Sequence, residues 1–493
     1  MRRLASGALL PALMLASVAA KFHQDLPAFA VRQNLQVPQA LHRSICSARA
    51  VELRLTPAPG RCGVEARPLL RVRHPPWISG ERHSDVTASM TLITPRDSGS
   101  GHMDAVGPDV TAPVLSAAEV QGLSVFNTVE ELGRELGGKG RAERVWKSIL
   151  ANNDPFEDDA IHANTKEQLL HRFEPLPVVV DKVVASDDTT KLLVRLRDGM
   201  EIEAVIIPHE SRPTAQKSLT GKTAARSTLC VSSQVGCNRA CVFCATGKMG
   251  FVRQLSAHEI LAQVHLARQV IAEDGLPPLH NVVFMGMGEP LNNVRNVKKA
   301  VDVIADHKAF NLGSSRVTVS SVGPSPASIR ACKDMPALLA WSVHAADEET
   351  RRKLVPTTAH SMVELRDAYL DVLESRSKQR SSFMVAVTLI DGVNDSRQHA
   401  RALSDLLQPF QTSAKCKGVM VDLIPYNDIG FGFPGEPAFG RARHDTIRAF
   451  QDEIRAAGFP CFVRVTRGDD SAAACGQLAT KSSRPAPQSS GPA

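Results

Sequence analysis

Three cysteines stand close together in the segment Cys237-Asn-Arg-Ala-Cys241-Val-Phe-Cys244. Thiolates at this C-x3-C-x2-C spacing are able to hold zinc or an iron–sulfur cluster. A structural zinc site takes four ligands, and no second pair of cysteine or histidine residues follows closely behind. Three ligands to a four-iron cluster leave one iron open for a substrate. The spacing therefore favours an iron–sulfur cluster over zinc or buried core thiols.

A second motif, Phe284-Met-Gly-Met-Gly-Glu289-Pro290-Leu-Asn292, follows the next apolar run. Its glycines allow a ligand to approach the backbone closely, and its carboxylate is able to accept hydrogen bonds from an ammonium group. By itself the motif is compatible with an ordinary turn. Its place one strand–helix unit after the cysteine loop favours a binding role.

Short β-branched runs alternate with helical patterns from about residue 227 onward. The runs cover residues 228–231, 281–285, 317–321, 338–343, 384–390, 419–424 and 461–466. The best-marked helix begins after Ser256, which forms a capping box with Glu259; residues 396–407 and 438–457 also show a helical pattern. This alternation predicts an α/β fold with a mainly parallel sheet, arranged as a barrel or partial barrel, whose chemistry lies at the carboxyl ends of the strands.

Other segments flank this region. Apolar residues recur at helical spacing within residues 123–176, and two β-rich runs follow at 191–196 and 202–207. We therefore predict a small helical domain at residues 116–180, a β-rich connector at 181–226, the main domain at 227–478 and a disordered Ser/Pro/Gly-rich tail at 479–493.

The composition is that of a soluble globular protein, with 43% hydrophobic and 22% charged residues in a chain of 493. No apolar run reaches the ~18 residues of a spanning helix, which argues against an integral membrane protein. Residues 1–100 hold 13 Lys+Arg and 6 Asp+Glu, so they carry the whole net charge of +7. The basic pI therefore describes the leader, and any affinity for RNA must come from local patches.

The leader has two parts. Residues 1–20 have the charged, apolar and small-residue order of a signal peptide, and residues 21–115 resemble a disordered, Arg-rich transit peptide. We expect routing to a plastid, with the mitochondrion second and plain secretion as a further alternative.

Ordered motifs from about Leu123 to Leu478 resemble the RlmN/Cfr family of radical S-adenosylmethionine (SAM) RNA methyltransferases. They include Thr228-Leu-Cys230-Val-Ser-Ser-Gln-Val-Gly-Cys237, Val317-Thr-Val-Ser320, Ser342-Val-His344-Ala, Asp391-Gly-Val-Asn-Asp395, Ile424-Pro-Tyr-Asn427 and Arg467-Gly-Asp-Asp-Ser-Ala-Ala-Ala-Cys475-Gly-Gln-Leu478. The resemblance implies a radical SAM partial (β/α)6 barrel with a small helical domain before it. It also implies one 4Fe-4S cluster held by Cys237, Cys241 and Cys244, and two SAM molecules per turnover.

The resemblance also implies catalytic roles. Cys475 would take a methyl group from one SAM, and a radical generated from a second SAM would activate that methyl for addition to an adenine ring carbon. Cys230 would then release the product by attacking the thioether sulfur, leaving a disulfide to be reduced. Glu203 would accept the proton that leaves the ring. By spacing alone, Glu203 is better explained as an exposed hairpin residue.

The SAM contacts that the resemblance implies come from successive strand ends. They are Gly288, Glu289, Ser320, Ser342, Val343, His344 and Asn427. Cys332, Cys416 and Cys461 match no family role and are expected to be core thiols.

The partners that the resemblance implies are large-subunit rRNA and tRNA, a ferredoxin- or flavodoxin-type electron donor and a thiol reductant. We expect a monomer without a membrane partner. Candidate phosphate contacts are the basic runs Arg351-Arg352-Lys353, Lys298-Lys299 and Arg376, Lys378, Arg380. Charge runs are more often solvated faces than binding sites.

Three alternatives stay open. A Cfr-type enzyme would methylate C8 of adenine instead of C2. A radical SAM activase of glycyl-radical enzymes would need the cluster but neither Cys230 nor Cys475. An RNA-binding or ribosome-assembly factor with the same fold would form no methylated product.

Overall fold

The computed structural model describes residues 122–210, 212–213 and 222–480. The predicted signal peptide, transit peptide and most of the predicted tail lie outside these residues. Ala479 and Thr480, which the sequence assigned to the tail, are part of the fold, since Thr480 is buried and the Ala479 amide is hydrogen-bonded. None of the helices in the described ranges is long and apolar enough to span a bilayer.

One ten-stranded sheet organises the described chain, in the order β1-β2-β3-β6-β9-β10-β11-β12-β13-β14. The strands are β1 (Val178–Val184), β2 (Thr190–Arg195), β3 (Glu201–His209), β6 (Arg226–Cys230), β9 (Leu279–Phe284), β10 (Val317–Ser321), β11 (Leu338–Ser342), β12 (Ser382–Leu389), β13 (Gly418–Pro425) and β14 (Cys461–Val463). Two-residue strands β4 (Arg212–Pro213) and β5 (Lys222–Thr223) pair with each other, as do β7 (Gln234–Gly236) and β8 (Phe251–Gln254).

Strands β6 and β9–β14 run parallel, whereas β1, β2 and β3 extend the β6 edge antiparallel to one another and to β6. β1 and β14 are the two ends of the sheet, so the described strands form an open barrel. This confirms the predicted α/β fold class. The β-rich connector is an extension of the barrel sheet and not a separate unit.

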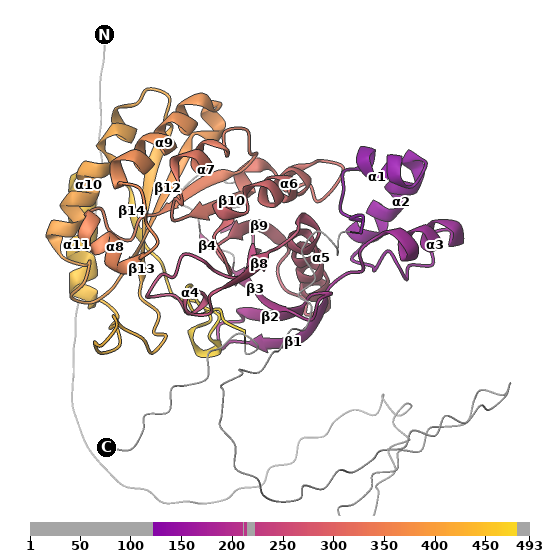
Figure 1. The fold of residues 1–493 in the computed structure, drawn as a ribbon, viewed down its shortest axis with the longest axis horizontal. Helices are drawn as coiled ribbons and strands as arrows, with labels where there is room; N and C mark the ends of the chain where they lie inside the picture. The colour runs from indigo at the N-terminus through magenta and orange to yellow at the C-terminus, as the bar shows by residue number, and fades with distance from the viewer. Residues whose placement is uncertain (1–121, 211, 214–221, 481–493) are drawn as a thin grey trace, which may run out of the picture. The chain divides into compact units, whose positions relative to one another are not determined.

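Helices connect the parallel strands and cover the outer face of the sheet (Figure 1). The helices are α1 (Val129–Glu135), α2 (Lys139–Leu150), α3 (Ala163–Arg172), α4 (Ala245–Lys248), α5 (Ala257–Glu273), α6 (Val294–Ala305), α7 (Pro326–Arg330), α8 (Glu348–Leu354), α9 (Met362–Ser375), α10 (Arg397–Thr412) and α11 (His444–Ala456). Short 3₁₀ turns lie at Pro290–Asn292, Ser314–Arg316, Lys378–Arg380 and Asp469–Ser471.

The capping box predicted at Ser256 is present, because its side chain accepts from the Glu259 amide while the Glu259 carboxylate accepts from the Ser256 amide. β10 has the bounds predicted for it. α11 starts later than predicted, at His444, because Arg441 pairs with Ile390 in an isolated β-bridge before the helix begins.

The helical segment α1–α3 packs on α5 through an aromatic and histidine cluster. The Trp146 indole N–H donates to the Asn127 carbonyl at 2.9 Å, and the Phe126 ring lies 5.3 Å from the His258 ring and 6.0 Å from the His265 ring. His258 also contacts Ser124 Oγ at 3.1 Å. Burial lowers the pKa of His258 and of His265 to about 4.

These two histidines predict acid sensitivity. A histidine with a pKa of about 4 in the folded chain and ~6.5 in the unfolded chain stabilises the fold above pH 6.5, and that contribution is lost as the pH falls toward 4. At pH 5 we expect a loss of about 2 kcal/mol per histidine relative to pH 7.5, measured by chemical denaturation. His265→Met should lose correspondingly less on acidification, whereas the exposed control His307→Gln should behave like wild type. Equal acid sensitivity of His265→Met and wild type would contradict this assignment.

Candidate active site

The three cysteines of the C-x3-C-x2-C motif lie in the loop between β7 and α4. This loop closes tightly on α4 because Gly247 carries no side chain: a Cβ there would lie 2.7 Å from the Cys241 carbonyl oxygen. The Cys244 amide donates to the Cys241 carbonyl at 3.2 Å, which tightens the last turn of the motif. The loop thus forms one compact wall at the carboxyl end of β6.

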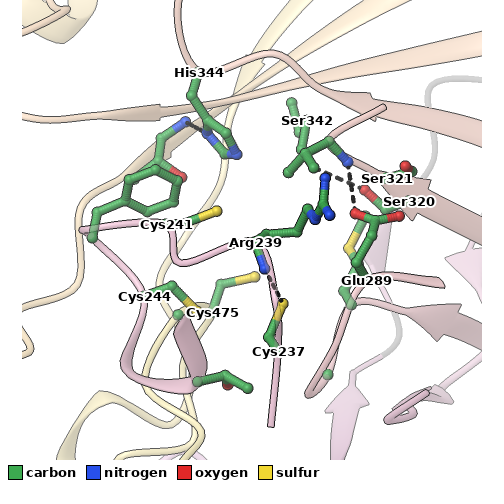
Figure 2. A pocket seen from close by; sticks show the side chains of 18 of the residues that line it. Cys237, Arg239, Cys241, Cys244, Glu289, Ser320, Ser321, Ser342, His344 and Cys475 are labelled. Atoms are coloured by element: carbon green, nitrogen blue, oxygen red, sulfur yellow. Dashed lines mark hydrogen bonds between the residues drawn. The ribbon is translucent and has the colours of Figure 1, made fainter. Parts of the chain in front are cut away.

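All three cysteines line a single cavity at the mouth of the barrel, which we call the mouth cavity. Figure 2 shows the thiols of Cys237, Cys241, Cys244 and Cys475 gathered on one side of this cavity, with Glu289 and Ser320 on the other. The strand ends of β9, β10, β11, β12 and β13 supply the remaining wall. The cavity therefore joins both sequence motifs in one site.

The thiols are largely withdrawn from water. Burial raises the pKa of Cys237 to about 12 and raises the pKa of Cys241 and Cys244 above that of a free thiol. Ionised thiolates would therefore need a nearby positive charge, which a bound metal centre supplies. Among the described residues, no three His, Cys, Asp or Glu side chains lie close enough to hold a single metal ion.

Glu289 lies opposite the thiols, buried at 3% exposure. Its carboxylate accepts from the Leu291 amide at 2.8 Å and from the Val322 amide at 3.0 Å, and burial raises its pKa. Gly288 adopts φ +98°, and a Cβ there would meet Gln234 at 2.5 Å. The glycine is thus required for the close approach that lets the Glu289 amide donate to Gln234 Oε1 at 2.7 Å.

The other predicted SAM contacts fall into two groups, because successive side chains of a strand point to opposite faces of the sheet. Ser320, Ser342, His344 and Asn427 all line the mouth cavity, and the Ser320 and Ser342 hydroxyls lie 3.0 Å apart. Val343 does not line it. Its side chain is fully buried in the hydrophobic core, so only its backbone is left to contact SAM, and the contact predicted for Val343 stays a prediction.

Phe243, the aromatic residue of the cysteine motif, packs on His344 with ring centroids 4.5 Å apart. Burial, together with the nearby Arg351 guanidinium, holds the pKa of His344 well below its usual value, so the ring is neutral at pH 7. The ring accepts a hydrogen bond from the Thr388 amide at Nδ1. A neutral imidazole thus packs between the cysteine loop and the end of β11.

The segment carrying Cys475 is held on two sides. Toward the cysteine loop, the Ala245 amide donates to the Gly476 carbonyl at 2.7 Å, and the Asn427 side-chain amide donates to the Cys475 carbonyl at 3.0 Å. Toward the connector, Lys191 donates to the Ala472 carbonyl at 3.2 Å. Figure 1 shows this yellow segment beside α4 and β2.

A second cavity, which we call the inner cavity, lies within the barrel between β3, β9 and the residues following β14. Cys475 lines both cavities, whereas Cys230 lines only the inner one. Burial and the neighbouring Cys475 raise the pKa of Cys230, while the Met285 amide and Arg464 act in the opposite direction. The fold therefore brings these two thiols, distant in sequence, to one cavity; both are free thiols.

Glu203 is buried on β3, two residues before Val205, which lines the inner cavity. Its carboxylate contacts the Lys191 ammonium at 3.2 Å and accepts from the Ala479 amide at 2.8 Å. It is thus not the exposed hairpin residue that its spacing favoured. It is also absent from the described lining of both cavities.

Several lining residues escaped the sequence analysis. Arg239, Thr388 and Tyr426 line the mouth cavity, and Arg464 lines the inner cavity. Thr388 and Tyr426 stand at the ends of predicted strands, a position that could have identified them. Arg464 gave no such signal; it is held by Asp422 at 2.9 Å.

Two of the predicted phosphate contacts are wrong. Arg351 is fully buried and donates to the Val343 and Val322 carbonyls. Arg376 is also buried and donates to the Ala337 carbonyl. Buried guanidinium groups that satisfy backbone carbonyls are structural. Lys298 and Lys353 are half-exposed or exposed and form i,i+4 ion pairs with Asp302 and Glu349.

The donor set fits both cofactors that the sequence implied. Three thiols on one wall are the type of donor that an iron–sulfur cluster takes, and a cubane holds its ligands at separate corners, further apart than a single ion does. On the facing wall, the buried Glu289 carboxylate and the two hydroxyls of Ser320 and Ser342 suit the polar groups of an amino acid moiety.

Comparison with known proteins gives an independent result. A sequence profile of the Radical SAM superfamily matches residues 231–403. The dual-specificity RNA methyltransferase RlmN of a Ruegeria strain is 38% identical over 362 residues, which cover 71% of this chain and 85% of that protein. The probable dual-specificity RNA methyltransferase RlmN of Thermus thermophilus is 40% identical over 365 residues, covering 72% and 94%.

Among solved structures, a radical SAM methyltransferase from Sphaerobacter thermophilus matches with a TM-score of 0.60 and 32% identity, over 72% of this chain and 98% of that one. The fold, the cysteine loop and these relatives agree: the chain belongs to the RlmN family of radical SAM RNA methyltransferases.

Proposed function

We propose that this protein methylates C2 of a specific adenine in large-subunit rRNA, and of an adenine in tRNA, through a methylated Cys475. The observation that carries the proposal is the position of Cys475 in the wall shared by the mouth cavity and the inner cavity. A thiol in that wall faces the cofactor site on one side and a substrate site on the other. Its exposure leaves it accessible to both.

Cys237, Cys241 and Cys244 would hold one 4Fe-4S cluster, and Glu289, Ser320, Ser342 and Asn427 would orient SAM beside it. When bound, the cluster and SAM together supply the methyl group and the radical chemistry. We infer two SAM molecules per turnover, one for the methyl group and one for the radical. A radical route suits C2, since this electron-poor amidine carbon is a poor target for an electrophilic methyl group.

The adenine would occupy the inner cavity. Its lining is mainly apolar, including Val205, Ile207, Met285 and Met384, which suits a purine ring taken out of its stack. In this position the ring would lie between Cys475 and Cys230. The apolar wall would also exclude water from the reacting carbon.

Cys230 would release the product. Its thiolate would attack the Cys475 sulfur, so that a sulfur–sulfur bond forms while the bond between that sulfur and the methylene carbon breaks. The electron pair stays with the carbon, which takes up a proton and becomes the methyl group. Because addition of a carbon radical would leave one unpaired electron on the ring, the ring would also give up one electron together with its proton, and the centre that Cys237, Cys241 and Cys244 would hold would accept that electron. A thiol reductant would then have to cleave the resulting disulfide and return both residues to the free thiols seen in the structure.

Glu203 would accept the ring proton. Its carboxylate is buried beside the inner cavity and is held by Lys191 and the Ala479 amide, in the segment that carries Cys475. A carboxylate so placed would reach the ring after a small movement of this segment. Glu203 would thereby link proton removal to the loop of the methylated cysteine.

The cluster and the cycling dithiol need a reducing compartment with a ferredoxin- or flavodoxin-type donor. We propose an organelle, the plastid first and the mitochondrion second, because the leader combines signal-peptide and transit-peptide features. The protein would act there as a monomer on RNA.

The function is tested with anaerobically reconstituted protein, SAM, a low-potential reductant, and separate rRNA and tRNA transcripts. We expect 2-methyladenosine in nucleoside digests analysed by mass spectrometry. 8-Methyladenosine would assign the Cfr-type reaction instead. Absence of any methyladenosine from both RNAs would remove the proposal.

The two thiols should differ in their effects. Cys475→Ala should lower the rate of methylation by at least ~10³-fold, because no thiol remains to carry the methyl group. Cys230→Ala should instead accumulate a covalent protein–RNA adduct, visible on a denaturing gel and removed by nuclease. Cys461→Ala, at a buried thiol outside both cavities, is the matched control and should form product without an adduct. Equal behaviour of the Cys230 and Cys461 variants would contradict the role of Cys230.

A further inference from the structure

A trough lies between α11 and β14, at the last strand of the open sheet. Its walls include Arg441, His444, Arg448 and Arg455 from the α11 side, and Phe462 and Val465 from the β14 side. We call it the α11–β14 trough. No family motif discussed above assigns it a role.

The trough and the inner cavity lie against the same segment of chain. Val463, Arg464, Val465 and Thr466 line both of them. A polymer lying in the trough would therefore run along the segment that also walls the inner cavity, which Cys230 and Cys475 line. Its position relates it to the substrate side of the site and not to the SAM side.

The charge of the trough favours a polyanion. Basic side chains line it, and no Asp or Glu is among its described lining residues. Arg441 is paired with Asp469 at 3.1 Å and Arg464 with Asp422 at 2.9 Å, outside that lining. Arg448 is exposed, forms no ion pair within the described chain, and contacts His444 at 3.5 Å. Its guanidinium is thus available to a phosphate group.

The trough also presents an exposed aromatic ring. Phe462 is 51% exposed and Val465 is 75% exposed, on or next to an edge strand where apolar residues would otherwise promote aggregation. Arg455 donates to the Cys461 carbonyl, so Arg448 is the one trough arginine with neither an ion pair nor a backbone carbonyl among its described partners. An aromatic face beside such a guanidinium group suits single-stranded RNA, since a base stacks on the ring while the arginine holds the backbone. A partner protein without acidic residues at this place would use the apolar residues but would leave Arg448 without a counter-charge.

We propose that the α11–β14 trough holds the RNA strand flanking the target adenine, with Arg448 on a phosphate and Phe462 under a neighbouring base. The proposal rests on the proposed function and deepens it by naming the surface that presents the adenine to the inner cavity. The flanking RNA strand, bound in the trough, would anchor the RNA while the target base leaves its stack.

The test is RNA binding measured by fluorescence anisotropy with a labelled fragment of large-subunit rRNA, independently of methylation. Arg448→Glu and Phe462→Ala should each weaken binding by about tenfold, and Arg448→Glu should reduce the slope of log affinity against log salt by about one. The matched control is Arg330→Glu on α7, whose exposed ion pair with Asp371 contributes little to stability and which lies away from the trough.

Binding by both trough variants at the level of Arg330→Glu would overturn the proposal. If Phe462→Ala leaves the RNA affinity unchanged but abolishes a wild-type dimer in sedimentation, the trough binds a second copy of the chain. That result would also overturn the proposal. These outcomes are separate from failure of the proposed function, which is absence of methyladenosine from wild-type reactions.

Discussion

The site depends on how the segment after β14 is held. This segment has no long helix or strand of its own, and hydrogen bonds fix it instead to the cysteine loop, to the end of β13 and to the connector strand β2. Because these contacts come from elements far apart in sequence, Cys475 reaches its place only when the whole barrel has formed. A thiol on an unconstrained tail would not be confined to the wall between two cavities.

The wall that contains Cys475 separates two cavities with different chemical character. The mouth cavity gathers the groups suited to a metal centre and to a charged amino acid, namely three thiols, a buried carboxylate and two hydroxyls. The inner cavity is mainly apolar and holds the second thiol, Cys230, with Arg464 nearby. Cys475 belongs to both, so one residue is able to receive a group on one side and deliver it on the other.

The strand–helix order, the Ser256 capping box and the positions of the cysteines were predictable because they follow from local patterns in the sequence. Three features were not predictable in this way. Val343 points into the core because neighbouring strand residues alternate faces, although the motif Ser342-Val-His344 treats them as one unit. Arg351 belongs to a basic run, yet it is the one member that points inward to satisfy backbone carbonyls. Arg464 lines the inner cavity only through tertiary contacts with Asp422, which no local pattern reveals.

The most direct test of the central claim is to locate the methyl group on the protein. Reconstituted protein is incubated with methyl-labelled SAM in the absence of RNA, digested, and its cysteine peptides are analysed by mass spectrometry. We expect one methyl group on Cys475, and transfer of that label to adenine when RNA is then added. Labelling of Cys230 instead, or product formation while Cys475 stays unlabelled, would contradict it.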